Sequence, residues 1–230
     1  MENKERFILI VYEIGGKMKN LKFAIFDLDG TLLESMEAWN NLGRDLLYPK
    51  GVKVPDNLND IIKPMTLRES AEYFQTAFKI NLSVDEILNE MSIIMEAKYK
   101  NELELKPYVK EYLIKLKNNN VKMCIASATP LNMIEAALKR LDIIDFFEFI
   151  SSCDEVGVGK NQPDIFYYAA KKLKAEPSEI AVYEDADFAL ITAKEANFYT
   201  IGVYDKFFHD KRKNIELISD IYIKSFKELI

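Results

Sequence analysis

The sequence reads Phe23-Ala24-Ile25-Phe26-Asp27-Leu28-Asp29-Gly30-Thr31-Leu32-Leu33 at the point that decides the fold. An apolar run rich in strand-forming residues stops at Asp27, and a second acid, Asp29, follows just before a glycine. A buried strand that ends in this way carries carboxylates to the carboxyl edge of a sheet, where open α/β sheets bind their ligands. Two acids so close together resist joint ionisation. The stretch therefore predicts an α/β fold with a functional site directly after this strand.

Strand-like and helical runs alternate from Pro107 to the end of the sequence. Strands are expected at 121–126, 147–150, 180–183 and 200–203, with an edge strand at 220–223. Helices are expected between them, over 107–118, 130–141, 163–173 and from the acids at 184–185 to 196. Strands that alternate with helices are joined by right-handed crossovers, and this part of the chain therefore predicts a parallel sheet.

The stretch from Glu34 to Leu105 shows helical periodicity and no clear strand. One helix is expected from about Ser35 to a stop near 49–51, and a second over 67–78. A third begins at Ser83, where Glu86 completes a capping box. We therefore expect a core made of residues 18–34 and 106–230, an inserted helical domain at 35–105 and an N-terminal extension at 1–17.

The extension is a poor targeting signal. Its apolar run, Phe7–Tyr12, is only six residues long and lacks a small-residue cleavage site. Because the residues from Met18 to Lys22 look like the natural beginning of the first strand, we expect Met18 to be the true initiator. The alternative is that the extension forms an extra strand at a sheet edge.

Composition excludes several classes of function. The net charge of −6 argues against broad nucleic-acid binding, which needs a basic face. No apolar run reaches the roughly 18 residues that cross a bilayer. Cys124 and Cys153 lack metal-ligand spacing and are interpreted as buried free thiols in a reducing compartment. We expect a cytoplasmic monomer that acts on a small molecule.

Four groups of polar residues stand at predicted strand ends or in the loops beyond them. In a doubly wound sheet these ends converge on one crevice. Acids, a hydroxyl and one lysine suit a hard divalent cation such as Mg²⁺ together with a phosphoryl group. The groups are Asp27 with Asp29, Ser127 with Thr129, Lys160 after Gly157-Val158-Gly159, and Glu184-Asp185 with Asp187.

These motifs make the chain similar to the haloacid dehalogenase superfamily, over about Leu21 to the end. Asp27-Leu28-Asp29-Gly30-Thr31 resembles the first motif of that family, Ser127 the second, Lys160 with Pro163-Asp164 the third and Glu184-Asp185 the fourth. The region 36–51 and the loop at 155–157 look like its β-phosphoglucomutase-related subgroup. The resemblance implies a Rossmann-like parallel-sheet core with an inserted α-helical cap, and a Mg²⁺-dependent phosphatase of a small phosphorylated metabolite.

The resemblance also implies roles for the acids. Asp27 is expected to attack phosphorus and form an aspartyl-phosphate. Asp29 is expected to act as general acid and base and to give its backbone carbonyl to the metal. Asp185 is an expected metal ligand, and Glu184 is expected beside the metal or bound to it through water.

The remaining site residues are expected to hold the phosphoryl group. Ser127 would donate a hydrogen bond to it, with Ala128 beside it in the substrate-binding set. Lys160 would neutralise charge on Asp27 and on the transferring group. Gly30 would let the backbone turn so that amides face the phosphate.

Departures from the family patterns limit the reactions that this chain is expected to catalyse. Trp39 stands where β-phosphoglucomutases carry a histidine, and their cap arginine falls near Leu67, with Arg68 adjacent. Both changes weaken the interpretation as a sugar-phosphate mutase, which stays open as an alternative, as does a non-catalytic phosphate-binding or regulatory domain. In the fourth motif, Ala186 and Ala189 replace the usual serine and glycine.

Other polar residues have simpler interpretations. Thr129 is expected to cap the helix at Pro130, Asp187 to favour the start of the next helix and His209 to lie at the surface. Three residues of the insertion are candidates for choosing the substrate, namely Trp39, Lys63 and Arg68.

Overall fold

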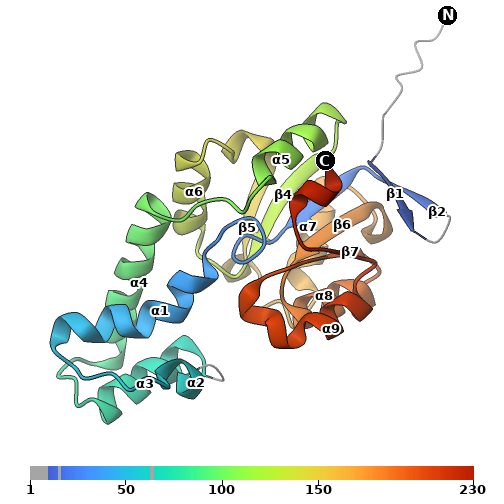
Figure 1. Cartoon of the computed structure of the whole chain (residues 1–230). Coiled ribbons are helices and arrows are strands. Elements are labelled where there is room, and N and C mark those ends of the chain that lie inside the picture. Colours follow the sequence, from blue (N-terminus) through green and yellow to red (C-terminus); the bar gives the residue numbers. More distant parts are fainter. Residues whose placement is uncertain (1–9, 15–16, 63–64) are drawn as a thin grey trace, which may run out of the picture. The chain divides into compact units, whose positions relative to one another are not determined.

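Figure 1 shows the computed structural model of the protein, which describes residues 10–14, 17–62 and 65–230. The chain folds into two compact units. The core unit comprises the chain up to Glu34 and again from Glu104 to Ile230, and the inserted unit comprises Ser35–Leu103.

The core unit contains a six-stranded sheet with the order β5-β4-β3-β6-β7-β8, and every neighbouring pair is parallel. This arrangement confirms the predicted Rossmann-like α/β class. The order also places the strand that leads to Asp27 between two others at the middle of the sheet. The strands are β3 (Phe23–Phe26), β4 (Lys122–Ser127), β5 (Phe147–Ser152), β6 (Ile180–Glu184), β7 (Tyr199–Val203) and β8 (Ile221–Ile223).

Helices connect these strands, as the alternating pattern predicted. The α-helices of the core unit are α5 (Val109–Asn118), α6 (Leu131–Arg140), α7 (Asp164–Leu173), α8 (Asp187–Glu195) and α9 (Arg212–Ile218). Short 3₁₀ turns complete it: η2 (Ile144–Phe146), η3 (Cys153–Glu155), η4 (Pro177–Glu179), η5 (Lys206–Lys211) and η6 (Phe226–Leu229). The sequence pattern did not predict α9, whose seven residues are too few to show a clear helical period.

One face of the sheet packs against α7 and α8. Ile25, Cys124 and Val182, on the three central strands, share a buried cluster with Ala169 of α7 and Ala193 of α8. Small residues on these helices allow their backbones to approach the sheet closely. Strand residues alternate between faces, so the neighbours of these three residues point to the other side.

The second face carries aromatic side chains. Phe26 stacks on Tyr183 with ring centroids 4.2 Å apart, and Tyr112 of α5 shares a buried hydrogen bond of 2.5 Å with the hydroxyl of Tyr183. Phe226 of η6 packs against both tyrosines. The residues directly before Asp27 and Glu184 are therefore locked together beneath the sheet edge.

Two further strands lie outside this sheet. β1 (Ile10–Ile14) and β2 (Lys17–Leu21) pair antiparallel in a sheet of their own. The expectation that the first strand of the core begins near Met18 is wrong, because residues 17–21 form β2 in this separate pair and β3 begins at Phe23. The strand at 10–14 agrees with the alternative that the extension forms a strand, but it pairs with β2 and does not join the six-stranded sheet. Residues 1–9 lie outside the described part of the chain.

The inserted unit is helical. Its elements are α1 (Met36–Leu47), η1 (Tyr48–Lys50), α2 (Leu58–Ile62), α3 (Leu67–Ala77) and α4 (Val84–Asn101). The capping box of Ser83 and Glu86 is present as predicted, and a second one, not predicted, joins Thr66 to Glu69 at the start of α3. Buried apolar side chains at helical spacing form its core, among them Leu42, Leu46, Phe74, Ile87 and Met91.

The helices of both units are too short or too polar for a membrane span. Within residues 10–14, 17–62 and 65–230, no helix combines the length and the apolar character that crossing a bilayer requires.

Candidate active site

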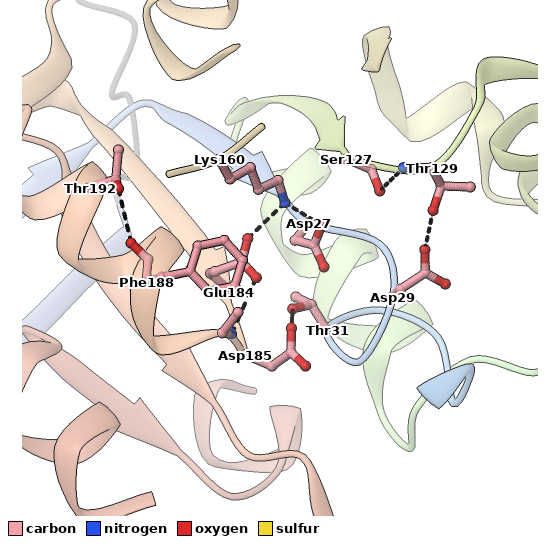
Figure 2. Close-up of polar contacts among 11 residues, drawn as sticks. Asp27, Asp29, Thr31, Ser127, Thr129, Lys160, Glu184, Asp185, Phe188 and Thr192 are labelled. Atoms are coloured by element: carbon pink, nitrogen blue, oxygen red, sulfur yellow. Dashed lines mark hydrogen bonds and ion pairs between the residues drawn. The ribbon is translucent and has the colours of Figure 1, made fainter. Parts of the chain in front are cut away.

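The candidate site lies at the carboxyl edge of the three central strands (Figure 2). Asp27 directly follows β3, Ser127 is the last residue of β4, and Glu184 is the last residue of β6. The loop before α7 supplies Lys160. Parallel strands end at the same edge, and this explains how residues far apart in the sequence come to lie close together.

Three buried carboxylates form the centre of the site. Asp27, Glu184 and Asp185 each offer an oxygen, and these atoms all lie within 4.8 Å of one another. The three residues are only 6%, 2% and 2% exposed. Carboxylates that are so close and so little hydrated repel one another strongly unless a cation or a proton lies among them.

Lys160 supplies a buried cation at one side of this cluster. Its Nζ donates to Oδ1 of Asp27, and to Oε2 of Glu184 at 2.7 Å. Burial alone would lower the pKa of Lys160, but the two carboxylates outweigh burial and raise the pKa above its ordinary value. Lys160 is therefore held in its charged form and ties β6 to the residue after β3.

Glu184 and Asp185 are oriented differently. Glu184 accepts from Lys160 and, through Oε1, from the backbone N–H of Ala186 at 3.3 Å. Asp185 accepts from the hydroxyl of Thr31 at 3.2 Å through Oδ1. Among the residues that the structure describes, Oδ2 of Asp185 has no hydrogen-bond partner, although it is buried. A buried oxygen of this kind is costly unless a ligand satisfies it.

Burial and neighbouring charge shift the pKa values of Asp27 and Asp185. Burial, reinforced by Glu184, raises the pKa of Asp27 from 3.8 to about 8, even though Lys160 opposes the shift. Burial likewise raises the pKa of Asp185 well above its ordinary value, with Glu184 and Asp27 adding to the effect. A pair of neighbouring acids that resists ionisation is typical of a functional site.

The donor set fits a divalent cation. Three carboxylates facing one ammonium leave two negative charges when all are ionised. The ligands are hard oxygens, which Mg²⁺ prefers, and within the described part of the chain Oδ2 of Asp185 is directed to no protein partner. The residues present therefore suit a metal ion at Asp27, Asp185 and, directly or through water, Glu184.

Asp29 and Ser127 lie on the other side of Asp27, joined through Thr129 (Figure 2). The hydroxyl of Thr129 donates to Oδ2 of Asp29 at 2.5 Å, and the backbone N–H of Thr129 donates to Oγ of Ser127 at 3.2 Å. The expectation that Thr129 caps the next helix is wrong. Pro130 occupies the N-cap of α6 without a side-chain cap hydrogen bond. The hydroxyl of Thr129 contacts Asp29 instead.

Sequence reasoning thus missed Thr129 as a contact of the site. A threonine two residues beyond a strand-end serine is equally compatible with a helix cap. The proline that follows does not separate the two, because proline is common at the first position of a helix and so favours the cap at Thr129. Only the structure, in which the N-cap falls on Pro130, decides between them.

Gly30 and Ala128 were both predicted to belong to the substrate-binding set, and they differ in their surroundings. Gly30 has φ of 76°, a left-handed conformation that favours glycine, and its own N–H donates to the carbonyl of Leu33. Its amide therefore closes the tight turn after β3, so Gly30 acts by shaping that turn. Ala128 is exposed between the buried residues Ser127 and Thr129.

The residues left out of the site lie where they were expected. Asp187 is in the first turn of α8 and accepts from Lys211 at 2.8 Å, and His209 is exposed in η5. Cys124 and Cys153 are free and buried, as predicted, and burial raises the pKa of both thiols.

The three substrate-selection candidates belong to the inserted unit. Trp39 donates from Nε1 to the hydroxyl of Tyr99 at 3.1 Å, which ties α1 to α4. Arg68 is exposed and pairs with Asp85 at 2.8 Å. Lys63 lies outside the described residues. The roles suggested for these side chains, and for the unit as a cap, stay predictions.

An α/β protein with a buried acidic site at the carboxyl edge of its sheet is the class that this fold and this cluster define. The haloacid dehalogenase-like hydrolase family matches residues 21–197, and the chain belongs to that family. The prediction of the family is thereby confirmed. The relatives that are named phosphatases bear out the prediction of a phosphoric monoester hydrolase.

Individual relatives support the same placement. The chain is 25% identical over 79% of its length to the phosphorylated carbohydrates phosphatase of Thermotoga maritima, and covers 84% of it. It is 29% identical over 80% of its length to β-phosphoglucomutase of Bacillus subtilis, covering 83% of that protein. The solved β-phosphoglucomutase of Clostridium difficile superposes with a TM-score of 0.69 at 24% identity, over 91% of this chain and 93% of that one, and shows the same fold.

Proposed function

We propose that this protein is a Mg²⁺-dependent phosphatase that hydrolyses a small phosphorylated metabolite through an aspartyl-phosphate on Asp27. The observation that carries the proposal is the buried cluster of Asp27, Glu184 and Asp185 with Lys160 against it. Family membership supplies the reaction class, and the cluster supplies a nucleophile beside groups that neutralise phosphate charge.

The first half of the reaction forms the aspartyl-phosphate. An oxygen of Asp27 attacks phosphorus while the bond from phosphorus to the ester oxygen breaks. The ester oxygen takes a proton from the carboxyl group of Asp29 and departs as an alcohol. Lys160 stabilises charge on the phosphoryl oxygens during the transfer.

The second half releases phosphate. Asp29, now a carboxylate, takes a proton from water, and the resulting hydroxide attacks phosphorus. The bond from phosphorus to Asp27 breaks, and inorganic phosphate leaves with both aspartates restored. Ser127 accepts a hydrogen bond from Thr129, so its own hydroxyl proton remains available to a phosphoryl oxygen.

Magnesium would complete the electrostatics of this site. Asp27, Asp185 and Glu184 would hold it, the last directly or through water, together with the backbone carbonyl of Asp29. Bound there, it would offset the repulsion among the acids and draw charge from the phosphoryl oxygens. The orphaned oxygen of Asp185 supports this assignment.

Phosphorylated carbohydrates are the first substrate class to test. One relative is described as a phosphatase of phosphorylated carbohydrates, and another as a hexitol phosphatase. Sugar and polyol phosphates should accordingly head a screen of phosphorylated metabolites. Cytoplasmic location and a monomeric state stay predictions.

The mutase is the second candidate, because β-phosphoglucomutase of Bacillus subtilis is a relative. A mutase would return the phosphoryl group to sugar rather than to water. Incubation with β-glucose 1-phosphate separates the two functions: a phosphatase releases inorganic phosphate, and a mutase accumulates the 6-phosphate.

Hydrolysis of p-nitrophenyl phosphate tests the proposal and the non-catalytic alternative together. We expect turnover with Mg²⁺, loss of turnover with a chelator, and recovery when Mg²⁺ is restored. Asp27→Asn keeps the shape of the side chain and should abolish turnover with the fold retained by circular dichroism. Turnover at the wild-type level in this variant would refute the nucleophile assignment, and an inert wild-type protein would favour the non-catalytic domain.

A further inference from the structure

Thr129 makes a contact in the site to which the proposed reaction assigns no role. It is only 4% exposed and lies just beyond β4, and its hydroxyl donates to Oδ2 of the half-buried Asp29 (Figure 2). A buried hydroxyl therefore binds one particular oxygen of the carboxyl group that the proposed reaction uses as its acid.

The backbone around Thr129 is itself held in place. Its N–H is satisfied by Oγ of Ser127 at 3.2 Å, and Ser127 is fixed at the end of β4 by pairing with Ser152 of β5. The following proline restricts the backbone of Thr129, and β-branching restricts its side chain. The hydroxyl therefore belongs to a rigid segment that follows β4, whereas Asp29 follows β3.

This geometry distinguishes the two oxygens of Asp29. Oδ2 accepts a hydrogen bond from Thr129, so a proton that Asp29 carries belongs on Oδ1. Holding Oδ2 also fixes the orientation of the whole planar carboxyl group, and with it the direction in which Oδ1 presents its proton. Proton transfer to an ester oxygen depends on such alignment.

We propose that Thr129 is a positioning residue for Asp29: its hydroxyl holds Oδ2, so that Oδ1 gives the proton to the departing oxygen. The inference rests on the proposed function, in which Asp29 is the general acid. In the step concerned, the bond from phosphorus to the ester oxygen breaks, and the proton moves from Oδ1 of Asp29 to that oxygen. Thr129 gains and loses no atoms.

The dependence on the leaving group tests this role. Phenyl phosphate and p-nitrophenyl phosphate have nearly the same shape, but phenoxide is far more basic and needs the proton more as it departs. In Thr129→Val, which keeps the branched shape without the hydroxyl, kcat/KM for phenyl phosphate should fall about tenfold further than for p-nitrophenyl phosphate. In Asp29→Asn, kcat/KM should likewise fall further for phenyl phosphate than for p-nitrophenyl phosphate, and both values should fall more than in Thr129→Val.

Two further variants make the comparison specific. Thr129→Ser retains a hydroxyl and should restore the wild-type ratio between the two substrates. Thr192→Val removes a hydroxyl that donates to the carbonyl of Phe188 in α8, away from the acids, and should leave the ratio and both rates unchanged. The ratio is measured on one preparation, so a reduced folded fraction does not affect it.

The outcomes separate this inference from the proposed function. An equal fall for both substrates in Thr129→Val, with an active wild type, would show that the hydroxyl serves only the structure, and would overturn the inference alone. Absence of wild-type turnover on both substrates in the presence of Mg²⁺ would overturn the proposed function and the inference with it.

Discussion

Lys160 shows how much the role of one residue depends on its surroundings. On the surface, a lysine of this kind would be unremarkable. Here its side chain is 5% exposed and lies between two carboxylates that would otherwise repel each other. Removing one partner from a buried ionic group leaves uncompensated charge, and the loss can reach about 3–5 kcal/mol of stability.

Replacing Lys160 by alanine should therefore affect both rate and stability. We expect kcat per folded molecule to fall about 10²-fold or more, by analogy with the loss of one group that stabilises the transition state. The melting temperature should fall as well. The rate is measured with p-nitrophenyl phosphate, and the melting temperature by thermal denaturation.

An exposed lysine provides the matched control for this substitution. Lys213 is exposed in α9, and Lys213→Ala should change neither rate nor melting temperature. An unchanged rate in Lys160→Ala would remove Lys160 from the site.

At the scale of elements, β7, β8 and α9 meet at one glycine. A Cβ at Gly202 of β7 would collide with Oγ of Ser219 and would lie 2.9 Å from Cγ2 of Ile215 in α9. It would also lie 3.2 Å from Cδ2 of Tyr222 in β8. The small residue is therefore what allows this edge of the sheet to be covered so closely.

Gly202→Ala should destabilise the protein by about 1–3 kcal/mol, the usual cost of overpacking a filled core. Chemical denaturation measures the change in the free energy of unfolding. Combining it with Ser219→Ala, which removes the closest atom, should recover part of the loss, because residues in contact give non-additive effects. Full additivity of the two substitutions would contradict this account of the packing.

At the scale of the whole molecule, the acid cluster links stability to pH and to metal. The pKa of Asp27 is raised in the folded protein, so between about pH 4 and pH 8 the folded state binds more protons than the unfolded state. In the absence of metal, the free energy of unfolding is therefore highest below about pH 4, and it falls as the pH rises toward 8. The pKa of Asp185 shifts in the same direction.

Magnesium should reverse this trend because it binds the ionised carboxylates. We expect the rise in melting temperature on adding Mg²⁺, relative to a chelator, to be larger at pH 8 than at pH 5. Asp185→Asn removes one ligand charge and should reduce the rise at pH 8. An equal rise at both values of pH would contradict a metal held by these acids.

Much of the fold could be predicted from local patterns. Apolar runs bounded by glycine, proline and acids marked the six core strands, and β4 and β6 lie within a residue or two of their expected bounds. These signals work because a strand buried on both faces needs a continuous apolar run. The short helix α9 lacked such a signal, since seven residues are too few to show a helical period, and β2, with the sequence KMKNL, has no continuous apolar run.

The chemistry of the site was likewise visible in the residue types at strand ends. Asp27, Ser127, Lys160 and Asp185 were singled out because parallel strands end at one edge, a rule that holds whatever the side-chain details. The partners of these groups follow from contacts between segments far apart in the chain. Thr129 was assigned to a helix cap, although it donates to Asp29, because a hydroxyl can serve either acceptor and its neighbours decide which.

The order of apolar runs, turns and acids along this chain was enough to specify a parallel α/β sheet, a helical insertion and an acidic edge, since each depends on local periodicity and on backbone chirality. Three-dimensional packing alone settled the contacts that were not predicted: Glu184 as a second acceptor of Lys160, Thr31 on Asp185, and one carboxylate oxygen without a protein partner among the described residues. The physical reason is that burial makes each pairing strong, and burial arises only when distant segments close around the same point.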